Sequence, residues 1–527
     1  MKKRILQIIA LVAVLCLLLT GCNLAGLYGT DYEDMVYSRP SVSQLTGCAD
    51  RCVSLAQENA DIDTLWLEIA GFFTLYSDYF TQYLLSYVHY CQDMTDIYWT
   101  DEYSYCEEQS AQVEAARDQL LHELAKSSAR EALESEDYFG ADYFDAYEGE
   151  SIWTEQFQAL KEQEAQLLTQ YYEISQEGAD LDPYSEAFFE DCGAQLEELY
   201  IQLVLVRQQL ALEAGYDSYP EYSFAAEYGR DYTAEDSMAF CRQISTELSG
   251  LYVDLADSGF WDMSLYATNE QATLQYVRTM AANMGGVVAQ SMELMIQNNL
   301  YDITYSPNKF DGSFEVFFYD YNEAFAFISP AGNELDHLSF AHEFGHFCND
   351  QVSGGSIAGI DTAEVFSQGM EYLSLFYSNP SDELTRMKLG DTLCAYVEQA
   401  AYHCFEQQVY GLSEEALTKE NLRTVFEDTC KDFGMDYWEL DNRTYVTVSH
   451  FFTQPLYTIS YVVSNDAAFQ LYQLEQQQKG AGLDILLAHL DTEQEYFLPF
   501  LEEAGLDSPF LEDRIPTVKK TLEQALL

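Results

Sequence analysis

Apolar residues recur at intervals of three and four along most of the chain, which is the spacing of one face of an α-helix. Helix-forming residues dominate from about Asp50 to Ala214, with interruptions near Gly140, Gly149 and Gly178-Ala179-Asp180. The clearest run of this kind has apolar residues at Phe188, Leu196, Leu199, Leu203, Val206 and Leu210. The chain contains only 10 prolines, which is consistent with long helices. We therefore predict a mainly α-helical protein whose N-terminal lobe spans residues 42–230.

One segment has a different pattern. Residues 312–329 are rich in aromatic and β-branched residues and end at Pro330-Ala331-Gly332, which is typical of short strands followed by a turn. The helical pattern resumes beyond this segment and continues to Leu527. A chain of 527 residues exceeds what one hydrophobic core usually supports. We predict a second lobe over residues 231–527, with a small sheet that precedes its central helix.

The N-terminus has the pattern of a secretory signal. Lys2-Lys3-Arg4 precedes an apolar stretch from Ile5 to Leu19, which is rather short for a membrane-spanning helix. The following Leu19-Thr20-Gly21-Cys22 resembles the bacterial lipobox. This resemblance implies a signal peptide over residues 1–21, a diacylglycerol on Cys22 and a tether over residues 22–41. It places the protein outside the cytoplasm, anchored to the bacterial cell membrane; the alternative is an uncleaved signal anchor.

Acidic residues greatly outnumber basic ones. The chain has 89 Asp and Glu against 24 Lys and Arg, a formal net charge of -65. Such a surface repels the phosphate backbone, so we exclude nucleic acid as a partner. The acidity has two interpretations: solvated helix faces that keep the protein soluble, or a field that steers cationic peptides toward a cleft. The sequence contains no signal for an oligomeric state.

A metal-binding pattern stands in the predicted central helix. It reads His342-Glu343-Phe344-Gly345-His346, within a helix that begins near Asn333 and ends near Gly354. Four residues advance an α-helix by slightly more than one turn, so both imidazoles project from one face and can bind one Zn²⁺. Glu343 then lies beside the metal, where it can take a proton from a water that the metal activates.

A catalytic zinc site needs a third protein ligand and an open position. Glu364 follows His346 by 18 residues, which is enough chain to reverse direction and place a second helix beside the first. Glu371 lies on the same face of that second helix. The alternative for Glu364 is a capping residue that reaches back to Asp361, and for Glu371 an ordinary exposed carboxylate. We predict His342, His346 and Glu364 as the ligands of one Zn²⁺ per chain.

These two motifs together resemble the thimet oligopeptidase and oligoendopeptidase F family of zinc metallopeptidases. The resemblance maps the third zinc ligand onto Glu364 and assigns Glu371 a supporting position beside the ligands. It implies a zincin-like fold: a helical, two-lobed ellipsoid with a deep substrate channel and a small β-sheet beside the active-site helix. The segment from His450 to Tyr461 is similar to the family's C-terminal segment. By that similarity His450, Tyr457 and Tyr461 reach the substrate carbonyl and the oxyanion that forms on it.

The predicted reaction is hydrolysis of internal bonds in short, unstructured peptides. Glu343 acts as the general base, and His450 with Tyr457 or Tyr461 stabilises the oxyanion. Two alternatives stay open at this point: a zinc carboxypeptidase of related helical fold, and a peptide-binding lipoprotein without catalysis. Zinc content and the fragments released from a test peptide distinguish the three.

Overall fold

The computed structural model describes residues 29–527 except 136, 179–180, 356–357 and 493. The predicted signal peptide and Cys22 therefore lie outside the described residues. The longer helices of the N-terminal half are α2 (Val42–Gln57), α3 (Ile62–Gln92), α4 (Ile97–Lys126), α6 (Glu155–Glu177) and α8 (Ala194–Glu213). Short helical turns join them, among them α5 (Arg130–Leu133), α7 (Glu186–Phe188) and α9 (Tyr219–Tyr222). The prediction of a mainly helical fold is confirmed.

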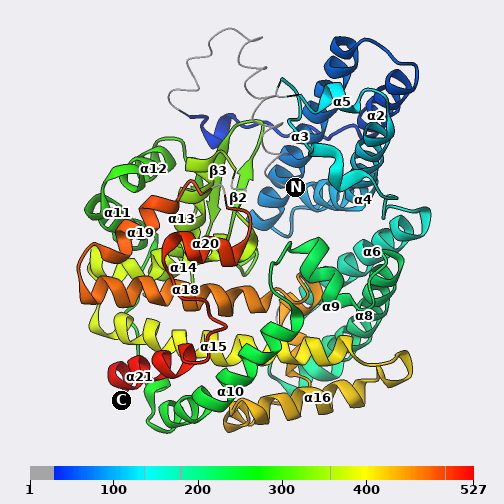
Figure 1. The fold of residues 1–527 in the computed structure, drawn as a ribbon. Helices are drawn as coiled ribbons and strands as arrows, with labels where there is room; N and C mark the ends of the chain where they lie inside the picture. The colour runs from blue at the N-terminus through cyan, green and yellow to red at the C-terminus, as the bar shows by residue number, and fades with distance from the viewer. Residues whose placement is uncertain (1–28, 136, 179–180, 356–357, 493) are drawn as a thin grey trace.

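The second half begins with α10 (Ala234–Asp257), α11 (Glu270–Met284) and α12 (Gly286–Gln297). It continues with α13 (Leu335–Ser353), α14 (Ile360–Tyr377), α15 (Asp382–Tyr410), α16 (Lys419–Asp432), α17 (Ser449–Thr453) and α18 (Thr458–Gln477). The last helices are α19 (Ala481–His489), α20 (Phe497–Ala504) and α21 (Arg514–Leu526). Figure 1 shows α14, α18, α15 and α10 lying across the lower half of the molecule, one below another.

Between α12 and α13 lies the small sheet that the sequence predicts. Its strands β1 (Tyr301–Asp302), β2 (Phe314–Phe318) and β3 (Glu323–Phe327) are arranged in the order β1-β3-β2. β3 pairs with β2 in antiparallel register, with Val316 opposite Phe325, and with β1 in parallel register. Every residue of β3 is buried, since the strand packs against α13 and occupies the centre of the sheet. β2 is an edge strand.

The buried apolar residues form two clusters. One comprises residues between Val42 and Tyr147, on α2, α3, α4 and the turn that follows. The other extends from the C-terminal end of α3 through α6 and α8 to Leu526. The long helix α3 contributes to both clusters and joins them. The predicted lobe boundary at residue 230 stays a prediction.

Residues 29–41, assigned above to a tether, lie against the sheet. The backbone N–H of Thr30 donates to Glu323 at 2.7 Å, and the ring of Tyr32 packs on Phe325 with centroids 4.3 Å apart. The ten cysteines of the described residues are free thiols. In the part of the chain that the structure describes, no helix combines the length and the apolar character that a membrane span requires.

Candidate active site

The helix α13 carries the first motif. It ends at Gly354, whose φ of +72° is the left-handed conformation that glycine adopts at little cost. His342 and His346 stand one turn apart, with ring centroids separated by 5.1 Å. Glu343 lies between them in sequence and its side chain is buried. Both imidazoles therefore project from one face of the helix, as the sequence predicts.

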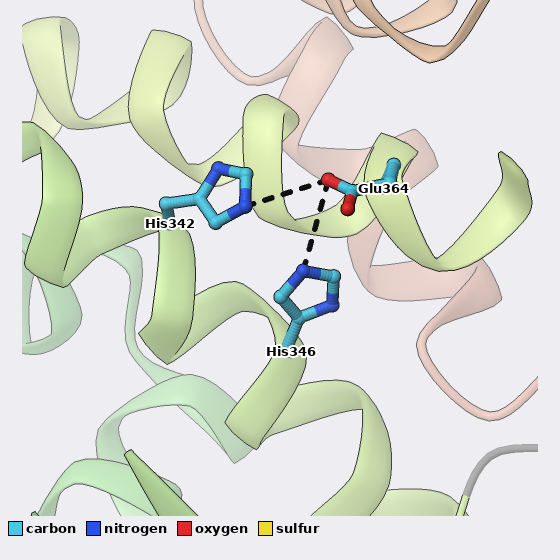
Figure 2. Close-up of side chains that lie close together, drawn as sticks. All are labelled: His342, His346 and Glu364. Atoms are coloured by element: carbon cyan, nitrogen blue, oxygen red, sulfur yellow. Dashed lines mark ion pairs between the residues drawn. The ribbon is translucent and has the colours of Figure 1, made fainter. Parts of the chain in front are cut away.

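The neighbouring helix α14 brings Glu364 to the two imidazoles (Figure 2). Its Oε2 atom lies 3.4 Å from Nε2 of His342 and 3.7 Å from Nε2 of His346. Ligand atoms that surround a tetrahedral zinc at about 2.05 Å lie about 3.3 Å from one another. Two imidazole nitrogens and a carboxylate oxygen at such separations fit a zinc ion, with a fourth position open toward the cleft described below.

A glycine inside the motif permits this approach. A Cβ atom on Gly345 would lie 2.6 Å from Cα of Ser367 and 2.7 Å from the carbonyl oxygen of Phe366. These are backbone atoms of α14, so they cannot move aside as a flexible side chain would. Any larger residue at position 345 would push α13 away from α14, and the Glu364 carboxylate would move away from the imidazoles.

Hydrogen bonds hold each candidate ligand in place. His342 donates from Nδ1 to Oε1 of Glu371 at 2.7 Å, and its Nε2 atom faces Glu364. The other oxygen of Glu371 accepts from Nζ of Lys388 at 2.7 Å. Glu364 is held in turn by the hydroxyls of Tyr457 at 2.6 Å and Ser367 at 2.9 Å. Such partners fix the orientation of ligands before a metal binds.

Burial and charge shift the pKa values of these groups in different directions. Burial alone would lower the pKa of His342, but the hydrogen bond to Glu371 and the charge of Glu364 raise it to about 9. Burial lowers the pKa of His346 to about 4. Burial, with the charges of Glu364 and Glu371, raises the pKa of Glu343 to about 8. A carboxyl group whose pKa lies near neutrality suits a base that both takes up and releases a proton.

The C-terminal segment places three polar side chains at the same site. Nε2 of His450, on α17, lies 3.2 Å from the hydroxyl of Tyr461 on α18. The rings of Tyr457 and Tyr461 are 5.1 Å apart, and the hydroxyl of Tyr457 is engaged by Glu364. Of these three side chains, His450 and Tyr461 are the two that are not bound to a candidate ligand.

Three side chains from distant parts of the sequence hold this segment; we call Arg207, Tyr228 and Glu406 the anchor residues. The guanidinium of Arg207, on α8, is fully buried and donates to the carbonyls of Phe451 and Phe452. The hydroxyl of Tyr228 donates to the carbonyl of Pro455 at 2.9 Å. The carboxylate of Glu406, on α15, accepts from the N–H of Leu456 at 2.9 Å.

Leu456 itself has a φ of +61°, which is unfavourable for a residue with a branched side chain. This turn reverses the chain between His450 and Tyr457. The anchor residues therefore fix an unfavourable turn that directs His450 and Tyr461 toward the candidate metal site.

A cleft of about 1440 Å³ opens over these groups. His342, Glu343, His346, Glu364, His450, Tyr457 and Tyr461 all line it, together with residues of β2 such as Glu315. The opposite wall consists of side chains from α3, α4 and α6. The predicted channel is thus present, and the candidate residues lie on one of its walls.

The structure brings together every site residue that the sequence predicts within the described chain. Their roles stay predictions, and lipidation at Cys22 lies outside the described residues. Sequence reasoning missed Ser367, Lys388 and the anchor residues. Gly345 could have been found, because a glycine in the middle of a helix destabilises it unless close packing requires it.

Comparison with known proteins supports this picture. Residues 32–151 match the model of the Peptidase M3 N-terminal domain family. These residues coincide closely with the first apolar cluster, between Val42 and Tyr147. No curated protein matches the chain significantly in sequence.

Solved structures resemble the chain over almost its whole length. A structure of PZ peptidase A with an inhibitor gives a TM-score of 0.81 at 18% identity, covering 94% of this chain and 98% of that one. A Bacillus anthracis protein that bears the name oligoendopeptidase F gives 0.79 at 18% identity, with the same coverage. Oligoendopeptidase F from Enterococcus faecium gives 0.59 at 13% identity, covering 92% and 96% of the two chains. The chain has the helical fold of these structures.

Proposed function

We propose that the protein is a zinc-dependent endopeptidase that hydrolyses short, unstructured peptides. One observation carries this proposal: ligand atoms of His342, His346 and Glu364 lie within 4.8 Å of one another on the wall of a cleft. The buried Glu343 is next to them on the same helix. A zinc ion held by these three ligands supplies Lewis-acid polarisation of a scissile carbonyl and of a water molecule.

Protein groups carry out the proton transfers. Glu343 takes a proton from the attacking water and passes it to the nitrogen of the leaving amine. The donors at His450 Nε2 and the Tyr461 hydroxyl stabilise the negative charge that develops on the carbonyl oxygen. Tyr457 acts mainly through Glu364, because its hydroxyl is engaged by that carboxylate at 2.6 Å.

The cleft also suggests how a peptide backbone is held. Among the described residues β2 is paired only with β3, and Phe314 and Glu315 of this edge strand line the cleft. An extended peptide can add to such an edge through backbone hydrogen bonds, a mode that recognises chain extension more than side chains. A folded protein does not present an extended segment of this kind, so short unstructured peptides are the expected substrates.

A single substitution tests the assignment of the base. Glu343→Gln keeps the shape of the side chain and removes the carboxylate, so we expect zinc to stay bound and turnover of a quenched fluorescent peptide to fall at least about a thousandfold. Zinc is measured by atomic absorption. The matched control is Glu123→Gln, which changes the same residue type after a histidine on α4 and leaves activity unchanged. Retained turnover in Glu343→Gln would overturn the assignment.

The products that the unmodified protein releases from a test peptide separate the two alternative functions. A peptide-binding lipoprotein would bind the peptide without releasing fragments. A carboxypeptidase would release single residues from the C-terminus, whereas the proposed endopeptidase releases internal fragments. Mass spectrometry of the products distinguishes these outcomes directly.

We further propose that a lipid on Cys22 anchors the protein to the outer face of the bacterial membrane. The support is the lipobox-like sequence Leu19-Thr20-Gly21-Cys22. Mass spectrometry of the N-terminal peptide should show a chain that begins with a diacylglyceryl cysteine. Cys22→Ser should release the protein from the membrane fraction; a variant that stays in that fraction argues for an uncleaved signal anchor.

A further inference from the structure

The wall of the cleft opposite the candidate metal site contains a group of tyrosines around one carboxylate. We call Tyr83, Tyr87, Tyr103, Tyr172 and Glu107 the tyrosine box. These residues come from α3, α4 and α6, and all of them line the cleft.

The rings of the box pack closely on one another. Tyr83 and Tyr103 are stacked, with centroids 5.8 Å apart and an interplanar angle of 9°. The ring of Tyr87 lies 5.3 Å from that of Tyr103. Tyr87 also contacts Phe314 of β2, with centroids 4.8 Å apart. The tyrosine box therefore lies directly beside the edge strand along which a peptide backbone is proposed to run.

Glu107 has no cationic partner. Within the described residues it forms no ion pair, and the hydroxyl of Tyr83 donates to it. The positive charge of Lys161 acts on Glu107, but its Nζ is already bound by Glu164 at 2.9 Å and Glu227 at 3.3 Å. Burial raises the pKa of Glu107, as expected for a carboxylate that has lost water without gaining a cation.

Acidic side chains outnumber basic ones among the residues that line the cleft. The carboxylate of Asp311 lines it without an ion pair among the described residues. Lys309, the cation among the residues that line the cleft in the described chain, is bound by Asp302 at 2.9 Å, and its side chain is only 2% exposed. The field inside the cleft therefore attracts positive groups, as does the net charge of -65.

We infer that the tyrosine box is a subsite for a positively charged group of the substrate, a Lys or Arg side chain or a peptide ammonium. The negative faces of aromatic rings attract a cation, and Glu107 supplies the full charge that the rings lack. A carboxylate-bearing side chain would be repelled by Glu107, and a neutral side chain would leave this carboxylate unpaired. The substrates are then cationic peptides.

This inference rests on the proposed function, so the test measures binding separately from turnover. The full-length Glu343→Gln protein, which does not consume the peptide, is titrated with unlabelled, C-terminally amidated nonapeptides by isothermal titration calorimetry. The peptides are Nα-acetylated and neutral except for one lysine, which is moved from position to position. Matched peptides carry norleucine or glutamate in place of that lysine, and one further peptide has no lysine but a free N-terminus, whose ammonium is its single positive charge.

At one position or a few adjacent ones, lysine should bind about tenfold more tightly than norleucine. Glutamate at the same position should bind more weakly than norleucine. Tight binding of the lysine-free peptide with a free N-terminus would identify the peptide ammonium as the group that is held. Equal binding of lysine, norleucine and glutamate at every position would overturn the inference.

Variants then locate the preference. Glu107→Gln in the Glu343→Gln background should reduce the preference for lysine to about twofold, since the rings alone attract a solvated cation weakly. The matched control is Glu108→Gln, the next residue on α4, which is exposed and does not line the cleft; it keeps the full preference. Tyr172→Leu is a second variant that retains apolar volume, and it should also reduce the preference. A preference that survives both substitutions places the cation elsewhere and overturns the inference.

Turnover by the unmodified protein distinguishes the two proposals. If lysine peptides bind preferentially but no peptide is cleaved, the endopeptidase proposal fails and the cationic subsite stands. If neutral and cationic peptides are cleaved with equal kcat/KM, the subsite fails and the endopeptidase proposal stands.

Discussion

Two pairs of packed helices, one in each apolar cluster, differ in the kind of residue that they bury between them. In the N-terminal part α2 packs on α3, and the buried residues of α2 are all apolar: Val42, Leu45, Cys48, Ala49, Cys52 and Ala56. At the site α13 packs on α14, and the residues buried on these helices include Glu343, Asn349, Glu364, Gln368 and Glu371. The first pair depends on the amount of apolar surface that it buries. The second depends on particular atoms at particular distances.

A glycine on each pair shows the same contrast. Gly71 of α3 has room for a Cβ atom, whose closest neighbour would be Sγ of Cys48 at 3.9 Å. Gly345 of α13 has no room for a Cβ atom, because backbone atoms of α14 occupy that space. Apolar packing tolerates changes that preserve volume, whereas a backbone approach of this kind tolerates almost none.

Removal of a candidate ligand should have the largest effect on the second pair. Structural zinc sites with four ligands bind with roughly 10–16 kcal/mol, or about 3–4 kcal/mol per ligand. Glu364→Gln should therefore weaken zinc binding about a hundredfold to a thousandfold. Competition with a fluorescent chelator measures the affinity. Glu68→Gln, which breaks an exposed ion pair with Arg51 on the first helix pair, should leave it unchanged.

Substitution of the glycine between α13 and α14 should have the next largest effect. Gly345→Ala should separate α13 from α14 and reduce kcat/KM about a hundredfold, since an ångström of misplacement is enough for such a loss. Gly71→Ala should instead stabilise the protein by up to about 1 kcal/mol, because alanine favours the helix and meets no obstacle. A peptide cleavage assay measures kcat/KM of Gly345→Ala, and urea denaturation measures the stability of Gly71→Ala. Full activity in Gly345→Ala would contradict the close approach described above.

Loss of the partner of Glu371 should have a smaller effect. Lys388 is buried, with a side chain 4% exposed, and Lys388→Met leaves Glu371 less firmly placed against His342. We expect zinc affinity to fall about tenfold, as for other residues that orient metal ligands. The matched control is Lys431→Met, which removes an exposed ion pair on α16. An unchanged affinity in Lys388→Met would show that Glu371 needs no counter-charge to orient His342.

An apolar truncation in the first pair should affect the site least. Phe72→Ala removes a fully buried ring from α3 and should lower the free energy of unfolding by about 3–5 kcal/mol. Zinc affinity of the folded protein should not change. Calorimetry and zinc titration check the two statements. A loss of zinc in a variant that remains folded would mean that the two clusters are not independent.

The fold and the candidate metal site followed from local signals. Helical spacing of apolar residues predicts helices, and residues 312–329 indeed contain the hairpin of β2 and β3. His342 and His346 are four residues apart, so the geometry of one helix alone brings their rings together. The two-residue strand β1 gave no detectable pattern, because its pairing with β3 depends on tertiary structure.

Other parts of the site depend on contacts that no local pattern reveals. Lys388 lies 17 residues beyond Glu371, and nothing in its neighbourhood distinguishes it from a surface lysine. Arg207 lies more than 240 residues before the carbonyls that it binds. The tyrosine box combines three helices of a chain with 41 tyrosines, so its members could not be singled out beforehand.

The position of Arg207 has a consequence for the integrity of the protein. A fragment that starts after residue 230 would still contain every candidate ligand, the proposed base and both proposed oxyanion donors. It would lack Arg207 and Tyr228, and the turn at Leu456 would keep only Glu406 of its three anchors. All the candidate catalytic residues therefore lie in the last three-fifths of the chain. The conformation of the segment that carries His450 and Tyr461 nevertheless depends on residues that precede this part.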